Sequence, residues 1–317
     1  MDKLIVSPSP HIRSDAATAK IMGNVLIALL PAVIAATLLF GGRALILVGV
    51  CTGSAIIWER LCNLVMKRPD TTGDLSAAVT GMILALNIPR SLPYWMAVLG
   101  TFIAIVIVKQ LFGGLGHNFA NPAIVGRIVL FLSFPSAMTA WTDPMLQPEV
   151  YDATTTATPL VSKAASYSDL FLGTVRGCLG ETCSFALLLG GMYLIAMKII
   201  SPATPIAFIG TVAAFSWLAG EDPLYQVLSG GLLLGALFMA TDYVTTPVTT
   251  LGKIIFGLGC GLITCVIRFY GSYPEGVSFS ILLMNIVTPY IDMLTETKPV
   301  GAKKKEKKDK KAKEAAA

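Results

Sequence analysis

The sequence is short of charge. Only 14% of its 317 residues are Asp, Glu, Lys or Arg, whereas 54% are hydrophobic. Soluble domains carry about a quarter charged residues, so this composition indicates an integral membrane protein. A cleavable signal peptide is also missing, because residues 1–14 are polar and no short apolar core with a small-residue cleavage site follows them. The first apolar run, residues 21–40, is long enough to span a bilayer and is expected to remain as a helix.

Residues and motifs that usually carry soluble enzyme chemistry are scarce as well. The chain has two histidines, His11 and His117, and contains neither a His-x-x-x-His pattern nor a Walker phosphate-binding loop. No Gly-x-Gly-x-x-Gly follows a strand pattern, and no Ser–His–Asp arrangement is indicated. Hydrolytic and nucleotide-driven chemistry are therefore poorly supported.

None of the six cysteines belongs to a Cys-x-x-Cys pair. Four of them lie inside apolar runs, where cysteine usually acts as a small buried hydrophobic residue. The other two, Cys178 and Cys183, flank a polar hinge. For these two, disulfide pairing or metal binding stands as the alternative to the commoner buried role.

Long hydrophobic runs, by contrast, are abundant. Apolar windows of about 17–25 residues, with shorter or broken ones allowed, predict about ten membrane segments. They cover approximately residues 21–40, 44–66, 75–88, 94–112, 121–134, 182–197, 203–219, 224–240, 252–270 and 277–293. The third and fifth are too short to cross about 30 Å of hydrocarbon as straight helices, which is typical of the broken helices in transporters. The predicted fold class is an all-α polytopic membrane protein.

The distribution of positive charge predicts the orientation in the membrane. Eight lysines lie between Lys303 and Lys313, and Lys and Arg predominate in the other parts that would share their side. The positive-inside rule then places both termini in the cytoplasm, which requires an even number of crossings. Next to a membrane helix, the lysine tail is expected to contact anionic lipid rather than nucleic acid.

Five segments precede the central polar insertion and five follow it, so the two halves are expected to run in opposite orientation as an inverted repeat. Weak internal similarity supports this, because residues 79–82 resemble 228–231 and residues 118–122 resemble 285–289. The predicted organisation comprises a cytoplasmic N-terminal segment 1–20, a first membrane repeat 21–134, an extracytoplasmic insertion 135–181, a second membrane repeat 182–297 and a basic cytoplasmic tail 298–317.

Two polar breaks interrupt the apolar runs. The first contains Asp242, within Met239–Pro247, where Pro247 and its β-branched neighbours predict that a helix ends. A carboxylate at such a break is expected either to serve a cofactor or cation site or to lie in water at a helix end. In the first case Asp242, Thr245 and Thr246 are candidates for an ion path.

The second break is the glycine-rich turn 113–123, which contains Asn118 and Asn121. The amides of asparagine offer both donors and acceptors, which suits the pyrimidine edge of a flavin. The alternative is a tight turn in which Asn121 caps the fifth helix and Pro122 takes its first position. The residues by themselves favour the cap.

A polar stretch rich in threonine, residues 150–160, separates the two halves. Hydroxyl groups with small neighbours, closed by Pro159, cannot form a membrane span. The pattern alone is typical of a loop whose hydroxyls cap helices or bond the local backbone.

Four separated motifs give the chain a specific resemblance to a known family. They are Val6–His11, Gly113–Arg127 with its Asn-Phe-Ala-Asn-Pro-Ala, Ala157–Leu160 and Met284–Asp292. In this order, and over nearly the whole chain, they resemble the D subunit of the Rnf complex and, more distantly, the B subunit of the sodium-pumping NADH:quinone reductase. The resemblance implies a fold like that of urea channels, with two inverted five-helix repeats.

The resemblance also implies a covalent cofactor. In that family the threonine that closes a small-x-Ala-Thr motif carries FMN through a phosphoester bond, and a dedicated transferase delivers the FMN from FAD. The implied acceptor is Thr158, and the implied recognition stretch comprises Asp152, Thr155, Thr156 and Ala157. Thr156 stands where the commonest form of the motif has glycine, and its β-branched side chain narrows the backbone choices.

A second flavin is implied by the distant relative, which binds riboflavin non-covalently near its own Asn-x-x-Asn-Pro turn. Asn118 and Asn121 thereby become candidates for a second flavin site. No catalytic residue and no metal ligand is implied on this chain.

The function implied by the resemblance is electron transfer within a bacterial or archaeal cell membrane. The chain is expected to be one subunit of a complex that couples ferredoxin:NAD⁺ oxidoreduction to Na⁺ or H⁺ translocation. Its expected partners are the A, B, C, E and G subunits, most directly the FMN-bearing G subunit. The rival interpretation is a small-solute channel or permease, which an inverted repeat equally supports but which leaves the threonine-rich insertion without a role.

Overall fold

The protein is helical throughout the part of the chain that its structure, a computed structural model, describes. The described residues are 17–144, 159–162, 165–181, 183–271 and 275–297. Four helices are long and apolar enough to cross a membrane: α1 (Thr18–Phe40), α2 (Gly42–Val65), α13 (Thr250–Tyr270) and α14 (Val277–Thr295). A multi-pass membrane protein is therefore confirmed in its coarse form.

The remaining apolar helices are shorter or interrupted. They are α3 (Ser76–Leu86), α4 (Tyr94–Phe102) with the π-helical η2 (Ile103–Gln110), α5 (Pro122–Ser133), α9 (Ser184–Ala196) and α10 (Ala203–Leu218), followed by α11 (Pro223–Leu228), α12 (Leu232–Leu234) and the π-helical η3 (Gly235–Met239). At 1.5 Å per residue, the 11 residues of α3 and the 12 of α5 cover well under the hydrocarbon thickness. The prediction that these two segments are short is confirmed. Each predicted segment contains helix, whereas the number of crossings and the inverted repeat stay predictions.

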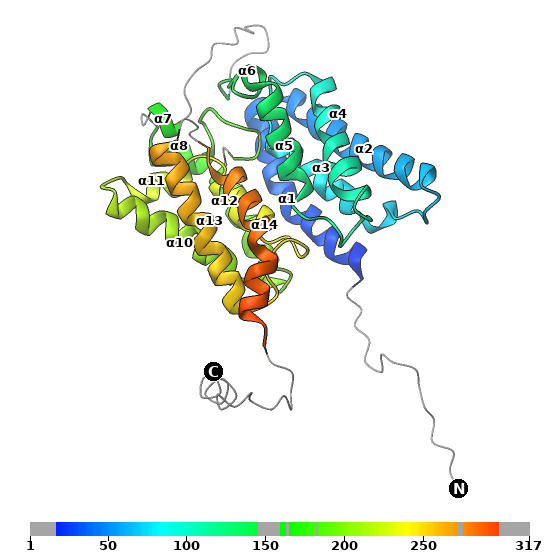
Figure 1. The fold of residues 1–317 in the computed structure, drawn as a ribbon. Coiled ribbons are helices and arrows are strands. Elements are labelled where there is room, and N and C mark those ends of the chain that lie inside the picture. Colours follow the sequence, from blue (N-terminus) through cyan, green and yellow to red (C-terminus); the bar gives the residue numbers. More distant parts are fainter. Residues whose placement is uncertain (1–16, 145–158, 163–164, 182, 272–274, 298–317) are drawn as a thin grey trace, which may run out of the picture.

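Short elements connect these helices. They are η1 (Thr72–Asp74), α6 (Pro135–Met138), α7 (Pro159–Ser162) and α8 (Tyr167–Leu172). The last three flank or lie within the predicted insertion, at the end of the molecule opposite the start of α1 and the end of α14 (Figure 1). The two terminal helices thus begin and end on the same side, as the topology prediction requires. Which side faces the cytoplasm stays a prediction.

Helices of the first and second halves of the chain pack against each other. The first long helix of the chain, α1, packs on α9 of the second half, and α5 packs on α14. Gly190 makes the first of these crossings close, because a Cβ there would overlap the carbonyl oxygen of Ala28. Small residues at helix crossings allow such an approach in membranes. A single hydrophobic cluster, including Leu29, Leu84 and Phe208, runs through both halves.

All six cysteines are free thiols. Cys51, Cys178, Cys260 and Cys265 are buried, and the other two are partly buried. The buried role is therefore the one that most of them have, and Cys178 and Cys183 do not form a disulfide.

Candidate functional site

A cavity lies between the two halves of the protein, beside the first turns of α1. It encloses about 780 Å³ of space, part of which is open to the surface. Its walls are mostly apolar, with Ile83, Leu115 and Phe238 among them. Its polar lining consists of Ser76, Thr80, Lys109, Asn118, Asn121, Thr241 and Asp242. Apolar walls with a few convergent polar groups are the usual composition of a ligand site.

One wall of the cavity is the glycine-rich turn that joins η2 to α5. Gly113, Gly114 and Gly116 have φ values of +123°, +95° and +92°, a region that side chains with a Cβ rarely adopt. The turn brings Asn121 to the start of α5, where its Oδ1 accepts a hydrogen bond from the backbone N–H of Ala123 at 3.0 Å. The predicted helix cap is therefore confirmed.

Asn121 does more than cap the helix. Its Nδ2 donates to the carbonyl oxygen of Met239 at 3.2 Å, so the amide also connects the first half of the protein to η3 in the second. Asn118, three residues earlier, donates from Nδ2 to the carbonyl of Ala120 at 3.0 Å. Both amides line the cavity, so capping and ligand binding do not exclude each other here.

The opposite wall is the other predicted break, which lies between η3 and α13. Asp242 is half-buried there, and its Oδ2 accepts a hydrogen bond from Thr245 Oγ1 at 3.1 Å. The side chain of Asn118 also hydrogen-bonds this carboxyl group. Burial raises the pKa of Asp242 above its usual value, against the hydrogen bonds from Thr245 and Asn118, which lower it. Asp242 is therefore a cavity-lining acid that takes up a proton more readily than an exposed aspartate.

A helix of the second half holds the two breaks together. On α14, Thr288 donates from Oγ1 to the carbonyl oxygen of Thr245 at 2.9 Å. One turn earlier, the amide of Asn285 donates to the same oxygen at 3.3 Å and accepts from the backbone N–H of Asn121 at 3.1 Å. Non-helical backbone within a membrane needs partners of this kind. Asn285, which the sequence places in the internal repeat and in the motif Met284–Asp292, thus connects both walls of the cavity.

The predicted ion-path residues lie within one turn of each other. Thr245 and Thr246 are buried, and Thr246 donates from Oγ1 to the carbonyl oxygen of Ala240 at 2.8 Å. Thr246 and Asp242 line a second, adjoining pocket that also contains Lys253. The structure therefore brings Asp242, Thr245 and Thr246 together beside the cavity.

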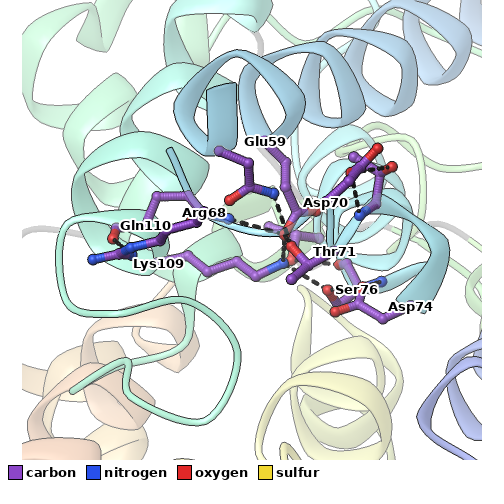
Figure 2. Close-up of polar contacts among 11 residues, drawn as sticks. Glu59, Arg68, Asp70, Thr71, Asp74, Ser76, Lys109 and Gln110 are labelled. Carbon is purple, nitrogen blue, oxygen red and sulfur yellow. Dashed lines mark hydrogen bonds and ion pairs between the residues drawn. The ribbon is translucent and has the colours of Figure 1, made fainter. Parts of the chain in front are cut away.

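A buried ion pair lies behind the cavity wall (Figure 2). Lys109 Nζ contacts Glu59 Oε1 at 2.6 Å and Ser76 Oγ at 2.6 Å. The same Glu59 oxygen accepts hydrogen bonds from Gln110 Nε2 at 2.9 Å and from Thr71 Oγ1 at 3.1 Å. The two charged side chains are 2% and 1% exposed, a burial that charged groups tolerate only when paired. Lys109 and Ser76 also line the cavity, so the pair supports one of its walls.

Comparison with known proteins places this arrangement in a family. Residues 5–301 match the NQR2, RnfD, RnfE family. This chain belongs to that family. It is 49% identical to the D subunit of the Na⁺-translocating ferredoxin:NAD⁺ oxidoreductase complex of Acetobacterium woodii, over 97% of this chain and 98% of that protein. It is 43% identical to the D subunit of the proton-translocating ferredoxin:NAD⁺ oxidoreductase complex of Clostridium ljungdahlii, over 94% and 96%.

A more distant member of the family is the D subunit of the ion-translocating oxidoreductase complex of Mannheimia succiniciproducens. That protein is 36% identical over 93% of this chain and 97% of its own length. The predicted family membership is confirmed by these matches. The family match at residues 5–301 includes both the threonine-rich stretch and the cavity residues.

The structure locates only part of the predicted flavin residues of this family member. Thr158 and its recognition residues Asp152, Thr155, Thr156 and Ala157 lie outside the described residues. The next described residues form α7, where the carbonyl oxygen of Pro159 accepts a hydrogen bond from Tyr225 Oη at 2.9 Å. Asn118 and Asn121, the other flavin candidates, line the cavity.

The residues that sequence reasoning missed are charged groups inside apolar segments. Neither Glu59 nor Lys109 belongs to a motif that the sequence patterns single out. Opposite charges within two predicted membrane segments are the signal that could have found this pair, because such groups are rare there and usually have a partner.

Proposed function

We propose that this protein is the D-type membrane subunit of a complex that couples ferredoxin:NAD⁺ oxidoreduction to ion translocation. The strongest support is the similarity to two curated D subunits of such complexes. The chain is 49% and 43% identical to them over nearly its full length. Ferredoxin and NAD⁺ would react on other subunits, so this chain is part of an enzyme. Its partners in this proposal are the A, B, C, E and G subunits.

The proposed cofactor is FMN, joined to Thr158 through a phosphoester bond by a flavin transferase. Bound there, the flavin would accept and pass on electrons singly, most directly with the FMN-bearing G subunit. Support comes from the Ala-Thr-Pro-Leu motif at residues 157–160 and from its position directly before α7. The protein's own contribution is to hold and orient the group at one end of the helical bundle.

A second, non-covalent flavin such as riboflavin is proposed for the cavity. The composition of the cavity suits an isoalloxazine ring, because Asn118 offers a polar edge whereas Ile83, Leu115 and Phe238 offer an apolar surface. Asn118 and Asn121 would hold the polar edge.

For the transported ion, the proposed lining is Asp242 with Thr245 and Thr246. These residues supply a carboxylate and hydroxyl oxygens, the ligand types that hard cations prefer, and the carboxylate also accepts a proton. Na⁺ and H⁺ both fit this chemistry. The curated relatives include one named for each ion.

The proposed setting is a multi-pass subunit in the bacterial or archaeal cell membrane. Both termini are cytoplasmic in this arrangement, residues 135–181 lie outside, and the two halves form inverted five-helix repeats like those of urea channels. The packing of α1 on α9 and of α5 on α14 supports the repeat, because a two-fold axis brings equivalent helices together.

The decisive experiment is in-gel flavin fluorescence of the denatured subunit, expressed with the transferase. A fluorescent band is expected for the native sequence and a dark one for Thr158→Ala. The matched control is Thr154→Ala, which removes a neighbouring hydroxyl that is not among the recognition residues and is expected to leave the band fluorescent.

A dark band from the native sequence, in cells that flavinylate other acceptors, would contradict the electron-carrier role. Solute flux through the purified protein in vesicles would then favour the small-solute channel. Loss of fluorescence in both Thr158→Ala and Thr154→Ala would mean that flavin attachment depends on the structure of the whole stretch, and it would contradict the assignment to the Thr158 hydroxyl alone.

A further inference from the structure

A second group of buried charges lies at the opposite end of the bundle from the cavity. Glu181 precedes α9 and Glu275 precedes α14, while Arg127 extends toward both from the middle of α5. Arg268, in the last turn of α13, completes the group. No role in the proposed flavin or ion chemistry accounts for these residues.

The two carboxyl groups face each other. Oxygens of Glu181 and Glu275 lie within 4.8 Å of one another, and Cys178 Sγ is equally close. Glu181 Oε1 accepts a hydrogen bond from the backbone N–H of Cys178 at 2.9 Å. Both acids line a pocket that encloses about 290 Å³, part of which is open to the surface, and that has room for about one water molecule.

Arg127 neutralises one of these acids. Its Nη2 forms an ion pair with Glu275 Oε2, its Nη1 donates to Ser278 Oγ, and its Nε donates to the carbonyl oxygen of Asn87 at 3.1 Å. Arg127 is 6% exposed, so little water reaches this pair. One guanidinium group therefore compensates one carboxylate.

Arg268 lies next to Gly230 of the same pocket without lining it, and its side chain is engaged elsewhere. Its Nη1 donates to the carbonyl oxygen of Gln226 at 2.7 Å and its Nη2 to that of Ser229 at 3.1 Å. Its Nε is buried and has no hydrogen-bond partner in the described part of the chain. Nη2 approaches the pocket at Gly230, lying 3.3 Å from the position a Cβ would occupy. A buried donor without a partner indicates a ligand or water at this place.

The chemistry of this group favours a proton over a metal ion. A metal held by Cys178, Glu181 and Glu275 would have to displace the ion pair with Arg127 and lie next to its positive charge. Burial also raises the pKa of the Cys178 thiol well above its usual value, so the thiolate that a metal requires is disfavoured. In the described part of the chain, Arg127 is the guanidinium group that forms a direct ion pair with one of these acids, whereas Arg268 donates to backbone carbonyl groups. Two facing carboxyl groups with one direct ion pair retain one proton between them, because both cannot ionise side by side.

We propose that Glu181 and Glu275 form a buried proton-binding pair, which holds a single exchangeable proton where α13 passes into α14. The small pocket beside them is the route by which a water molecule delivers or removes that proton. Burial, to which the negative charge of Glu181 adds, raises the pKa of Glu275 to about 7, while Arg127 opposes the rise. The proton belongs to the pair as a unit. The charged or titratable groups around Glu275 are Arg127, Arg268, Glu181 and Cys178, together with Arg176, which lines the same pocket.

Arg127 also connects this pair to the cavity. From Asn87, whose carbonyl accepts from Arg127, the chain of contacts continues through Asn87 Nδ2 to Met239 Sδ at 3.5 Å. The carbonyl of Met239 accepts from Asn121 at 3.2 Å. Binding or release of the proton changes the charge that Arg127 faces. The series of contacts described above leads from Arg127 to the cavity-lining amide of Asn121. The proton site does not depend on whether a flavin is bound.

The test is infrared spectroscopy of the purified, intact complex, in which this subunit carries ¹³C-labelled glutamate. The native protein is expected to show one protonated-carboxyl band that shifts on labelling, moves in D₂O and titrates near neutral pH. Glu181→Gln and Glu275→Gln are each expected to remove that band, because the remaining carboxylate is then compensated by Arg127. Glu296→Gln, which removes an exposed glutamate directly after α14, is the matched control and is expected to keep it.

Two results would overturn the proposal. One is the absence of a protonated glutamate band from the native protein between about pH 5 and 9, which would mean that the pair is fully ionised. The other is a band that persists in both glutamine variants, which would place the proton elsewhere. If a variant fails to assemble, the titration of the labelled native protein still decides whether a protonated glutamate is present, and the other variant decides whether it belongs to the pair. Neither result depends on flavin fluorescence.

Discussion

At the two ends of this bundle, buried polar and charged groups find their partners in opposite ways. At the cavity end, Asn118, Asn121 and Asp242 face open space and are held by a few hydrogen bonds from neighbouring turns. At the other end, Arg127 and Glu275 are closed in and compensated by each other. Charges without solvent must be compensated within the fold, whereas groups around a cavity remain free for a ligand. Substitutions are therefore expected to affect stability at one end and binding at the other.

The largest effect is expected from Arg127→Met. This change leaves Glu275 beside Glu181 with no direct cation, and an uncompensated buried charge costs about 3–5 kcal/mol. Thermal unfolding of the purified complex, followed through this subunit, measures the loss. Arg176→Met is the control, because its half-exposed ion pair with Asp143 contributes at most about 1 kcal/mol. Equal losses in the two variants would remove the distinction between a closed and an open end.

The ion pair behind the cavity wall tests the same idea with a rescue. Lys109→Met leaves the buried carboxylate of Glu59 without its cation and is expected to destabilise the folded protein by about 3 kcal/mol. The double variant Lys109→Met/Glu59→Met is expected to recover most of that loss, because it leaves no unpaired charge. A double-mutant cycle on unfolding midpoints measures the recovery. Failure of the double variant to recover would mean that the cluster around Ser76 and Gln110 depends on the charges themselves.

A pH dependence distinguishes the proton-binding pair. The folded protein holds the Glu275 proton up to a pKa of about 7, whereas the usual value in an unfolded chain is 4.5. Between these pH values the unfolded chain has released a proton that the folded one keeps, so stability falls as pH rises through this window, by at most about 3 kcal/mol. In Glu275→Gln this slope is expected to disappear. Unfolding midpoints across the window check it, and an unchanged slope would exclude Glu275 as its source.

The smallest effect on stability is expected at the cavity. Asn121→Ala removes a helix cap and is expected to cost about 1 kcal/mol, whereas Asn121→Ser keeps the cap but loses the bond to Met239. Both variants are expected to lose non-covalent flavin, measured after denaturation. Retention of that flavin in both would separate Asn121 from any ligand site and leave it as a cap alone.

Much of this architecture is readable from local pattern. Long apolar runs predict the helices, and Asn121 before Pro122 predicts where α5 begins. Pro247 predicts the break after η3, which the structure has at residues 241–249. Each of these depends on residues within a few positions of one another, where hydropathy, capping and the missing N–H of proline act directly.

The contacts that make the sites are of another kind. Asn121 and Met239 are 118 residues apart, Arg127 and Ser278 151, and Lys109 and Glu59 50. Nothing in the local pattern of one member specifies its partner. Such groups are brought together because each would be costly alone in an apolar interior, and the packing of the two halves decides which of them meet.

The sequence by itself therefore determined that this is a helical membrane protein of its family, where its helices begin and break, and which threonine is the candidate for a flavin. Only the tertiary structure decided that the two breaks face one cavity and that two glutamates share the closed end with Arg127. The reason is physical: helix formation and membrane insertion follow the local solvent preference of the chain, whereas the compensation of buried polar groups depends on what the rest of the fold places within hydrogen-bonding distance.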